Sequence, residues 1–287
     1  MEIIGKSELW SFYERNGKAN PTKNTRVRKS QAIPVRSFLE LAKKIAELQF
    51  RNREQVLLFR GQGADYRNQQ GNTTLKPRLF RPEEGKNGNP RSEVLIPRFE
   101  QLTGAERMLA ELCVSQKVMG HEGIQRHRIL RWAVLQHYEV CRTPLLDVTQ
   151  SLRIAASFAS HENKKEAFVF VVGVPNLSGA VTASAEAGLQ IIRLASVCPP
   201  SALRPHLQEG FLLGEYPEMV GYEQKQHYHH YEIDFGRRLV SKFRFNPSEF
   251  WGRDTFPQVA KSALYPNKDD PLFDLAQELT SALVPVN

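Results

Sequence analysis

The pattern of apolar and polar positions predicts a chain that mixes helices with strands. Residues 37–49 carry apolar side chains at helical spacing, and Ser37 is suited to cap the start of that helix. Residues 56–59 and 167–174 are short apolar runs, and the second contains no polar side chain, which is typical of a strand buried on both faces. The same patterns predict helices at 93–99, 103–119, 129–138, 151–160, 257–263 and 273–283, and strands at 190–194 and 239–245.

The order of these segments predicts an α+β fold. Helices come first and interrupted strands follow, so we expect a helical N-terminal part followed by a mixed or split β-sheet. Residues 65–90 are rich in Gly, Asn, Pro and Arg and are expected to form a long loop. No stretch has the composition of a linker. We therefore expect a basic N-terminal segment at residues 1–34 and a single domain at residues 35–287.

The net charge of +8, with a sequence pI near 9.4, directs attention to anionic partners. Residues 18–36 contain Lys and Arg but no acid, and Arg126, Arg128 and Arg131 form a second basic set. A basic surface raises the local concentration of nucleic acid, nucleotide or acidic protein. Solubility alone explains the charge equally well, and no aromatic residue interleaves residues 18–36 as a stacking platform for single-stranded nucleic acid would require.

The apolar runs are too short to cross a bilayer. Because residues 1–10 also lack the pattern of a secretion signal, we expect a soluble cytoplasmic protein that binds no membrane. The three cysteines, Cys113, Cys141 and Cys198, are widely spaced and form no CxxC pair, which argues against a disulfide framework and a structural zinc site. They are expected to be buried thiols, with a nucleophilic Cys141 as a minor alternative.

The strand at 56–59 ends in a charged residue, Arg60, followed by Gly61, Gln62 and Gly63. The stem of such an arginine is buried, and its guanidinium needs an anion or a carbonyl as partner. The glycines allow the backbone to turn or to approach a ligand closely. This short motif fits a structural ion pair at least as well as a clamp on an anionic ligand.

Two further segments carry polar side chains at the ends of predicted elements. Gln136 and His137 close the helix at 129–138; a lone histidine there is usually structural, but the adjacent hydrogen-bonding side chains favour a binding cluster. Asp147 and Thr149 follow two leucines and precede the helix at 151–160. They either cap that helix or face a ligand at its N-terminus.

A third segment places Gln208 and Glu209 directly before a glycine and an apolar strand. A carboxylate there could stabilise an electron-poor sugar carbon, although a solvated turn explains it as well. His227, His229 and His230 invite comparison with a metal site. In a strand, however, His230 would point away from the other two, so we predict no metal.

Taken together, these segments resemble the FRG domain family over about residues 35–280. The matching series is Phe59-Arg60-Gly61-Gln62, then Leu75, Pro77 and Leu79-Phe80-Arg81, then Glu93 and Phe99, then Gln136-His137-Tyr138, Leu145-Leu146-Asp147 and Thr149, then Ala155, Phe158 and Ala159, and finally Arg204, Gln208, Gly210-Phe211 and Leu264-Tyr265-Pro266. The chain departs from the usual family pattern at residues 139–144, Val148 and Leu152. A pocket wall near Asp147 is therefore expected to differ in shape.

A more distant resemblance is to ADP-ribosyltransferases. They also carry an aromatic-Arg-Gly strand, a Ser-Thr-Ser strand leading into a short helix, and a later strand with a catalytic Glu or a substitute. The resemblance implies an ADP-ribosyltransferase-like fold with NAD as substrate. It assigns binding of NAD to Arg60, Gly61, Gln62, Gln136, Asp147 and Thr149, and catalysis to Gln208, Glu209 and His137. Gln208 is the family match, whereas Glu209 is chemically better suited to the role.

We expect the chain to be an ADP-ribosyltransferase-like protein that binds NAD and modifies a nucleic acid or a protein, consistent with a toxin or phage-defence role. The alternative is a non-catalytic module that binds nucleotide or nucleic acid. A nuclease that uses Asp147, His137 and Glu93 ranks last, because no metal-binding pattern accompanies these residues.

Overall fold

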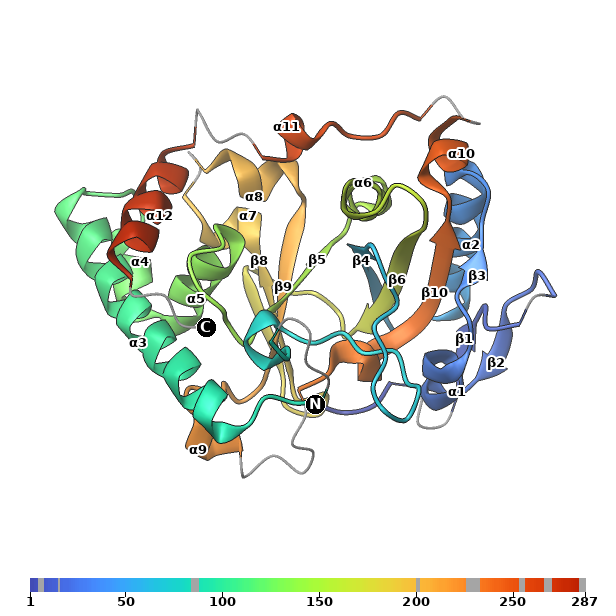
Figure 1. Cartoon of the computed structure of the whole chain (residues 1–287), viewed down its shortest axis with the longest axis horizontal. Coiled ribbons are helices and arrows are strands. Elements are labelled where there is room, and N and C mark those ends of the chain that lie inside the picture. The colour runs from blue at the N-terminus through green and yellow to red at the C-terminus, as the bar shows by residue number, and fades with distance from the viewer. Residues whose placement is uncertain are drawn as a thin grey trace. The chain divides into compact units, whose positions relative to one another are not determined.

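The computed structural model describes residues 1–4, 8–14, 16–83, 88–199, 202–225, 233–252, 256–265 and 270–283. The chain forms two compact units (Figure 1), and each is built from segments far apart in the sequence. The first unit comprises residues 1–75, 148–178 and 234–264, and the second comprises residues 76–147, 179–233 and 265–287.

A mixed sheet forms the centre of the first unit. Its strands lie in the order β3 (Ile33–Pro34), β10 (Leu239–Phe245), β6 (Ala167–Val174), β4 (Val56–Gln62) and β5 (Leu146–Thr149). β3 is parallel to β10, whereas the β10–β6, β6–β4 and β4–β5 pairs are antiparallel. All eight residues of β6 are buried, which confirms the prediction from its apolar composition.

The other elements of the first unit include segments from the basic N-terminal part of the chain. They are β1 (Leu9–Ser11), β2 (Asn20–Thr22), α1 (Asn24–Lys29), α2 (Phe38–Arg51), α6 (Leu152–Glu162), the 3₁₀ helix η2 (Phe235–Arg238), α10 (Pro247–Gly252) and α11 (Lys261–Leu264). α2 begins as predicted, with the Ser37 hydroxyl accepting a hydrogen bond from the Glu40 amide at 3.2 Å. Strands within residues 1–34 mean that the N-terminal part is less helical than the sequence pattern predicts.

The second unit combines three antiparallel strands with most of the long helices. Its elements are the 3₁₀ helix η1 (Arg78–Phe80), α3 (Ser92–Ser115), α4 (His121–Arg126), α5 (Arg128–His137), β7 (Val181–Ser184), β8 (Leu189–Arg193), α7 (Leu194–Val197), α8 (Leu203–Leu207), β9 (Gly210–Glu215), α9 (Tyr222–Lys225) and α12 (Pro271–Ala282). β8 pairs with both β7 and β9, and α3 packs against α4, α5 and α12. The α+β prediction is thus confirmed. No helix in the described ranges is both long and apolar enough to cross a membrane.

The helix α6 packs directly on β4 and β6 (Figure 1). A Cβ atom built on Gly61 would lie 1.8 Å from the backbone oxygen of Ala155. Glycine is therefore required at this position so that the helix can approach the strand. Packing alone accounts for Gly61, without a ligand.

Substituting Gly61 with alanine is expected to lower the free energy of unfolding by about 1–3 kcal/mol, the usual cost of overpacking, because the backbone of α6 must move. Gly104, inside α3, is a matched control, because a Cβ atom added there would meet no other atom within 4 Å. At Gly104 the same substitution should stabilise the chain by about 0.5–1 kcal/mol. Urea denaturation of both variants tests this pair, and equal effects would refute the packing role of Gly61.

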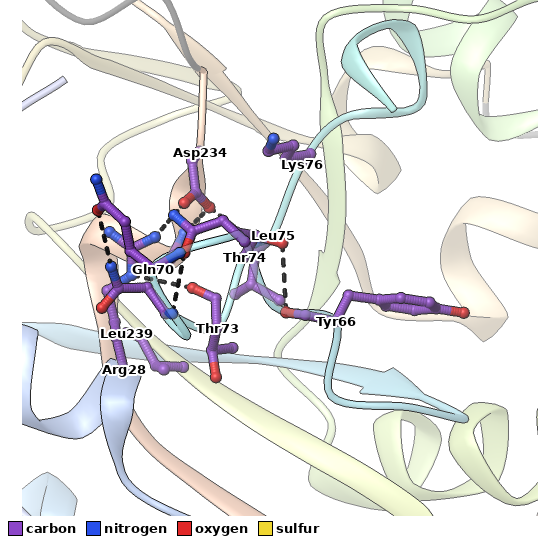
Figure 2. Close-up of polar contacts among 12 residues, drawn as sticks. Arg28, Tyr66, Gln70, Thr73, Thr74, Leu75, Lys76, Asp234 and Leu239 are labelled. Atoms are coloured by element: carbon purple, nitrogen blue, oxygen red, sulfur yellow. Dashed lines mark hydrogen bonds and ion pairs between the residues drawn. The ribbon is translucent and has the colours of Figure 1, made fainter. Parts of the chain in front are cut away.

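Residues 65–75 of the first unit are held by buried charges (Figure 2). Asp234 pairs with Arg28, and its Oδ1 accepts hydrogen bonds from the amides of Leu75 and Gly236 at 2.8 and 2.9 Å. The Nε of Arg28 donates to the carbonyl of Thr73 at 2.9 Å. Residues 65–75, the first part of the predicted loop, are thus fixed at several points.

Lys242, on β10, is the buried cation of the same network. Its side chain is 1% exposed, and its Nζ donates to Asp65 at 3.1 Å, to the Thr73 hydroxyl at 2.5 Å and to the carbonyl of Arg28 at 3.1 Å. Burial lowers the pKa of Lys242 to about 8, against the opposing effect of Asp65. Asp65 also pairs with Arg67 at 2.7 Å. A single lysine therefore joins the loop to the sheet.

Candidate functional site

Strand β4 places Arg60 and Gln62 on one face of the sheet in the first unit. Side chains alternate between the faces of a strand, and Gly61 faces α6, so its two neighbours point to the opposite face. They pair across the sheet with Phe170 and Phe168, whose rings stack at a centroid distance of 6.2 Å. Gln62 is buried, and its Oε1 has no hydrogen-bond partner within the described part of the chain. The strand thus brings a guanidinium and an amide onto one face.

Thr149 lies beside β4 but faces the other way. It pairs with Phe59, and residues directly opposite each other in an antiparallel pair share a face. Its hydroxyl accepts a hydrogen bond from the Ser151 amide at 3.0 Å, at the start of α6. Arg60 and Thr149 are therefore on neighbouring strands with their side chains on opposite faces. The contact with Ser151 lies within the turn that precedes α6, and the NAD-binding role of Thr149 stays a prediction.

In the second unit, Gln136 orients Asp147. Its Nε2 donates to Asp147 Oδ2 at 2.5 Å, and its Oε1 accepts from the hydroxyl of Thr143 at 2.6 Å. The same hydroxyl accepts from the Leu145 amide at 3.2 Å. The structure brings together two residues that the sequence assigns to NAD binding. Because both ends of the Gln136 amide are engaged, this side chain acts by positioning the carboxylate.

His137 is a buried imidazole at the end of α5. Its side chain packs edge-on against Tyr138, and it forms a hydrogen bond with the backbone of Arg204. That bond involves Nδ1, because Nε2 has no partner among the residues that the structure describes. Burial, together with the charge of Arg204, lowers the pKa of His137 to about 3. The ring is therefore neutral near pH 7, and its Nε2 is an acceptor.

Arg204, on α8, is the cation near His137, and the sequence did not assign it to the site. Its guanidinium is buried, lies 4.5 Å from the ring centroid of Tyr265 and pairs with Glu139 at 3.2 Å. Its backbone amide donates to Asp270, which also accepts from the hydroxyl of Tyr138 at 2.7 Å. Arg204 is thus anchored on both its backbone and its side chain. Its place in the family series, shortly before Gln208, was the signal that could have identified it.

Gln208 and Glu209 form the turn between α8 and β9. The backbone amide of Gln208 donates to the carbonyl of Arg204 at 3.1 Å, and the Gln208 side chain is buried. Glu209 is exposed and has a φ of 46°, a left-handed conformation that is unfavourable for residues other than glycine. The structure therefore distinguishes the two candidates by burial and by backbone strain.

The basic sets found in the sequence are partly neutralised. Arg128 and Arg131 both pair with Glu106, at 2.9 and 3.3 Å. From residues 18–36, Arg26 lies over the ring of Tyr13 at 4.7 Å. Tyr13, an aromatic residue outside residues 18–36, thus contacts this basic segment. Nucleic-acid binding stays a prediction.

Cys141, the minor candidate for a nucleophile, is a buried thiol. Burial raises the pKa of Cys141 to about 12, which keeps its thiol protonated. The histidines at 227, 229 and 230 lie outside the described residues. Within the described ranges, no group of His, Cys, Asp or Glu side chains could hold a metal ion.

Comparison with known proteins identifies one family. The family model of the FRG domain matches residues 55–167, which include Arg60, His137, Asp147 and Thr149 but not Gln208. No curated protein and no solved structure matches the chain. The predicted FRG resemblance is confirmed, whereas the likeness to ADP-ribosyltransferases stays a prediction.

Proposed function

We propose that this chain, whose residues 55–167 match the FRG domain family, is an ADP-ribosyltransferase-like protein that takes NAD as substrate and modifies a macromolecule. The observation that carries this proposal is the buried, neutral His137, whose Nε2 is an acceptor without a partner in the described residues. Such an activity would suit a toxin or a protein of phage defence.

Acceptor groups close to a buried cation suit a phosphorylated sugar. Ribose hydroxyls donate hydrogen bonds, and a neutral imidazole can accept one. The carboxylate of Asp147, oriented by Gln136, is the type of group that binds ribose in dinucleotide-binding proteins. Arg204, whose charge acts on His137, supplies positive charge for a phosphate. This set lies entirely in the second unit, so the proposal does not depend on Arg60 and Gln62, which stay predicted NAD-binding residues.

The proposed reaction breaks the bond between the nicotinamide nitrogen and ribose C1′. The bonding electron pair leaves with nicotinamide, which becomes neutral, and C1′ passes through an oxocarbenium-like state. A nucleophile of the acceptor macromolecule then bonds to C1′ and releases its proton. A polar oxygen near C1′ would stabilise the developing positive charge, and Gln208 and Glu209 are the candidates.

Purified chain incubated with NAD and cell lysate is expected to release nicotinamide and to label RNA, DNA or protein. His137→Phe keeps a ring of similar size but removes the acceptor nitrogen. It should weaken NAD binding by about tenfold, the equivalent of one hydrogen bond of about 1.4 kcal/mol. His127→Phe, at an exposed position after α4, is the matched control and should bind NAD like the wild type. Calorimetric titration measures the binding, and thermal unfolding confirms that both variants are folded.

The outcomes separate the two candidate functions. NAD binding that depends on His137 without any release of nicotinamide would favour the non-catalytic nucleotide-binding module. Equal NAD affinities of the two histidine variants would remove His137 from the site. No detectable binding of NAD by the wild type would refute both readings of this cluster.

A further inference from the structure

Arg98 and Arg142, in the second unit, each carry a buried donor atom that has no partner among the residues the structure describes. Arg98, on α3, is 1% exposed, and its Nη1 donates to the carbonyls of Leu79 and Arg81, each at 2.8 Å. Its Nε and the Nη1 of Arg142 are both buried and have no hydrogen-bond partner in the described part of the chain. A buried guanidinium is costly unless its charge and its donors are compensated.

The 3₁₀ helix η1 holds the two arginines near each other. The Leu79 amide donates to the carbonyl of Thr143 at 3.3 Å, and the Leu79 carbonyl accepts from Arg98. Leu79 therefore contacts both the side chain of Arg98 and Thr143, the residue that follows Arg142. Their charges also interact, because the charge of Arg142 contributes to the lowered pKa of Arg98.

The positive charge of this pair exceeds what the nearby acid compensates. Burial first, and the charge of Arg142 second, lower the pKa of Arg98 to about 10, and the opposing effect of Glu83 is smaller than either. Two further cations belong to the same region: Arg78 is exposed on η1, and Arg81 follows it, with its Nε bound to the carbonyl of Lys76 at 2.9 Å. The region is therefore strongly positive around two donors that are buried.

We propose that Arg98 and Arg142 form a binding site for a phosphate group. Guanidinium groups match the oxygens of phosphate in geometry, and their charge-assisted hydrogen bonds are the strongest ordinary ones in proteins. A phosphate with two negative charges would compensate both arginines and engage the Nε of Arg98 and the Nη1 of Arg142. The group belongs either to a small phosphorylated molecule or to a nucleic-acid backbone, because both present the same oxygens.

The test titrates the full chain with inorganic phosphate and pyrophosphate at constant ionic strength, with chloride as the reference ion. Pyrophosphate is expected to raise the melting temperature of the wild type more than chloride does. Arg142→Gln should weaken pyrophosphate binding by about tenfold to a hundredfold. It should leave the melting temperature without phosphate unchanged or higher, because it removes a like charge next to Arg98. Arg107→Gln, on the exposed side of α3, is the matched control and should bind as the wild type does.

Competition identifies the source of the phosphate. Displacement of pyrophosphate by AMP assigns the site to a small ligand, and displacement by a short RNA oligonucleotide assigns it to a nucleic-acid backbone. Either result supports the site if Arg142→Gln weakens binding of the competing ligand as it weakens binding of pyrophosphate. Equal affinities of Arg142→Gln and Arg107→Gln, or a wild type that responds to pyrophosphate no more than to chloride, would overturn the proposal. The probes are inorganic anions, so this result does not depend on the turnover of NAD.

Discussion

Lys242→Met is expected to lower the free energy of unfolding by about 3–5 kcal/mol, the usual cost of removing one partner from a buried ion pair. The lysine is 1% exposed, and its ammonium contacts Asp65, Thr73 and the carbonyl of Arg28. Methionine preserves most of the volume but removes the ammonium, so the Thr73 hydroxyl loses its donor, whereas the carbonyl of Arg28 keeps the backbone amide of Thr73 at 3.0 Å. Asp65 keeps Arg67 as a partner, which places the expected effect at the lower end of the range. Chemical denaturation monitored by circular dichroism measures the change.

Arg244→Met provides the matched control. Arg244 lies two residues further along β10, on the same face, and its guanidinium pairs with Glu166 at 2.7 Å. Both side chains of that pair are well exposed, at 36% and 47%. Exposed ion pairs contribute about 0–1 kcal/mol, so this variant should be nearly as stable as the wild type. Similar losses in the two variants would mean that burial of Lys242 is not what makes it important.

The same lysine predicts a dependence on pH. Its pKa falls from an ordinary value of 10.5 to about 8 in the folded protein. Between these values the unfolded chain binds more protons than the folded chain, so stability rises with pH. The cost of keeping the ammonium buried is present in full below about pH 8 and disappears as the pH rises through that range. The stability of the wild type relative to Lys242→Met should therefore increase from pH 8 to pH 10; a constant difference would contradict the shift.

The local sequence pattern predicted most elements of the fold but not all their limits. The helices predicted at 93–99 and 103–119 form one helix, α3. It runs through Pro97 and Gly104, two residues that are unfavourable inside a helix. The helix expected at 257–263 is confined to α11, residues 261–264. The continuity of α3 could not be predicted from local propensity, because the packing of α3 against other helices outweighs its two unfavourable residues.

The candidate site was predictable as a set of residues but not as an arrangement. Arg60 and Gln62 lie on one face of β4 because side chains alternate along a strand, and this placement can be predicted from the sequence. The contacts of Gln136 with Thr143 and Asp147 join segments that no local pattern relates. The burial of Arg98 and the proximity of Arg142 are likewise properties of the packed second unit, and they depend on where η1 lies.

Gln208→Ala is expected to reduce the release of nicotinamide by about 10²-fold, while NAD affinity changes by less than about threefold. Removing a polar group that stabilises developing charge affects the transition state far more than the ground state. Gln208 is favoured over Glu209 because its side chain is buried and its backbone is bound to Arg204, in the helix that also contacts His137. Single-turnover kinetics and binding titration on the same preparations separate the two effects.

Glu209→Gly tests the competing assignment. It relieves a φ of 46° and should stabilise the chain by up to about 1 kcal/mol, while turnover stays unchanged if Gln208 is the functional group. Lys117→Gly, at an exposed residue with a φ of 51°, is the matched control for backbone strain. If Glu209→Gly gains stability but loses turnover, and Lys117→Gly does not lose turnover, the functional role belongs to Glu209. Backbone strain can persist at a functional residue because the surrounding structure holds it in place. If neither Gln208→Ala nor Glu209→Gly alters turnover, the proposed transfer reaction fails, and the cluster around His137 is better explained as a binding site alone.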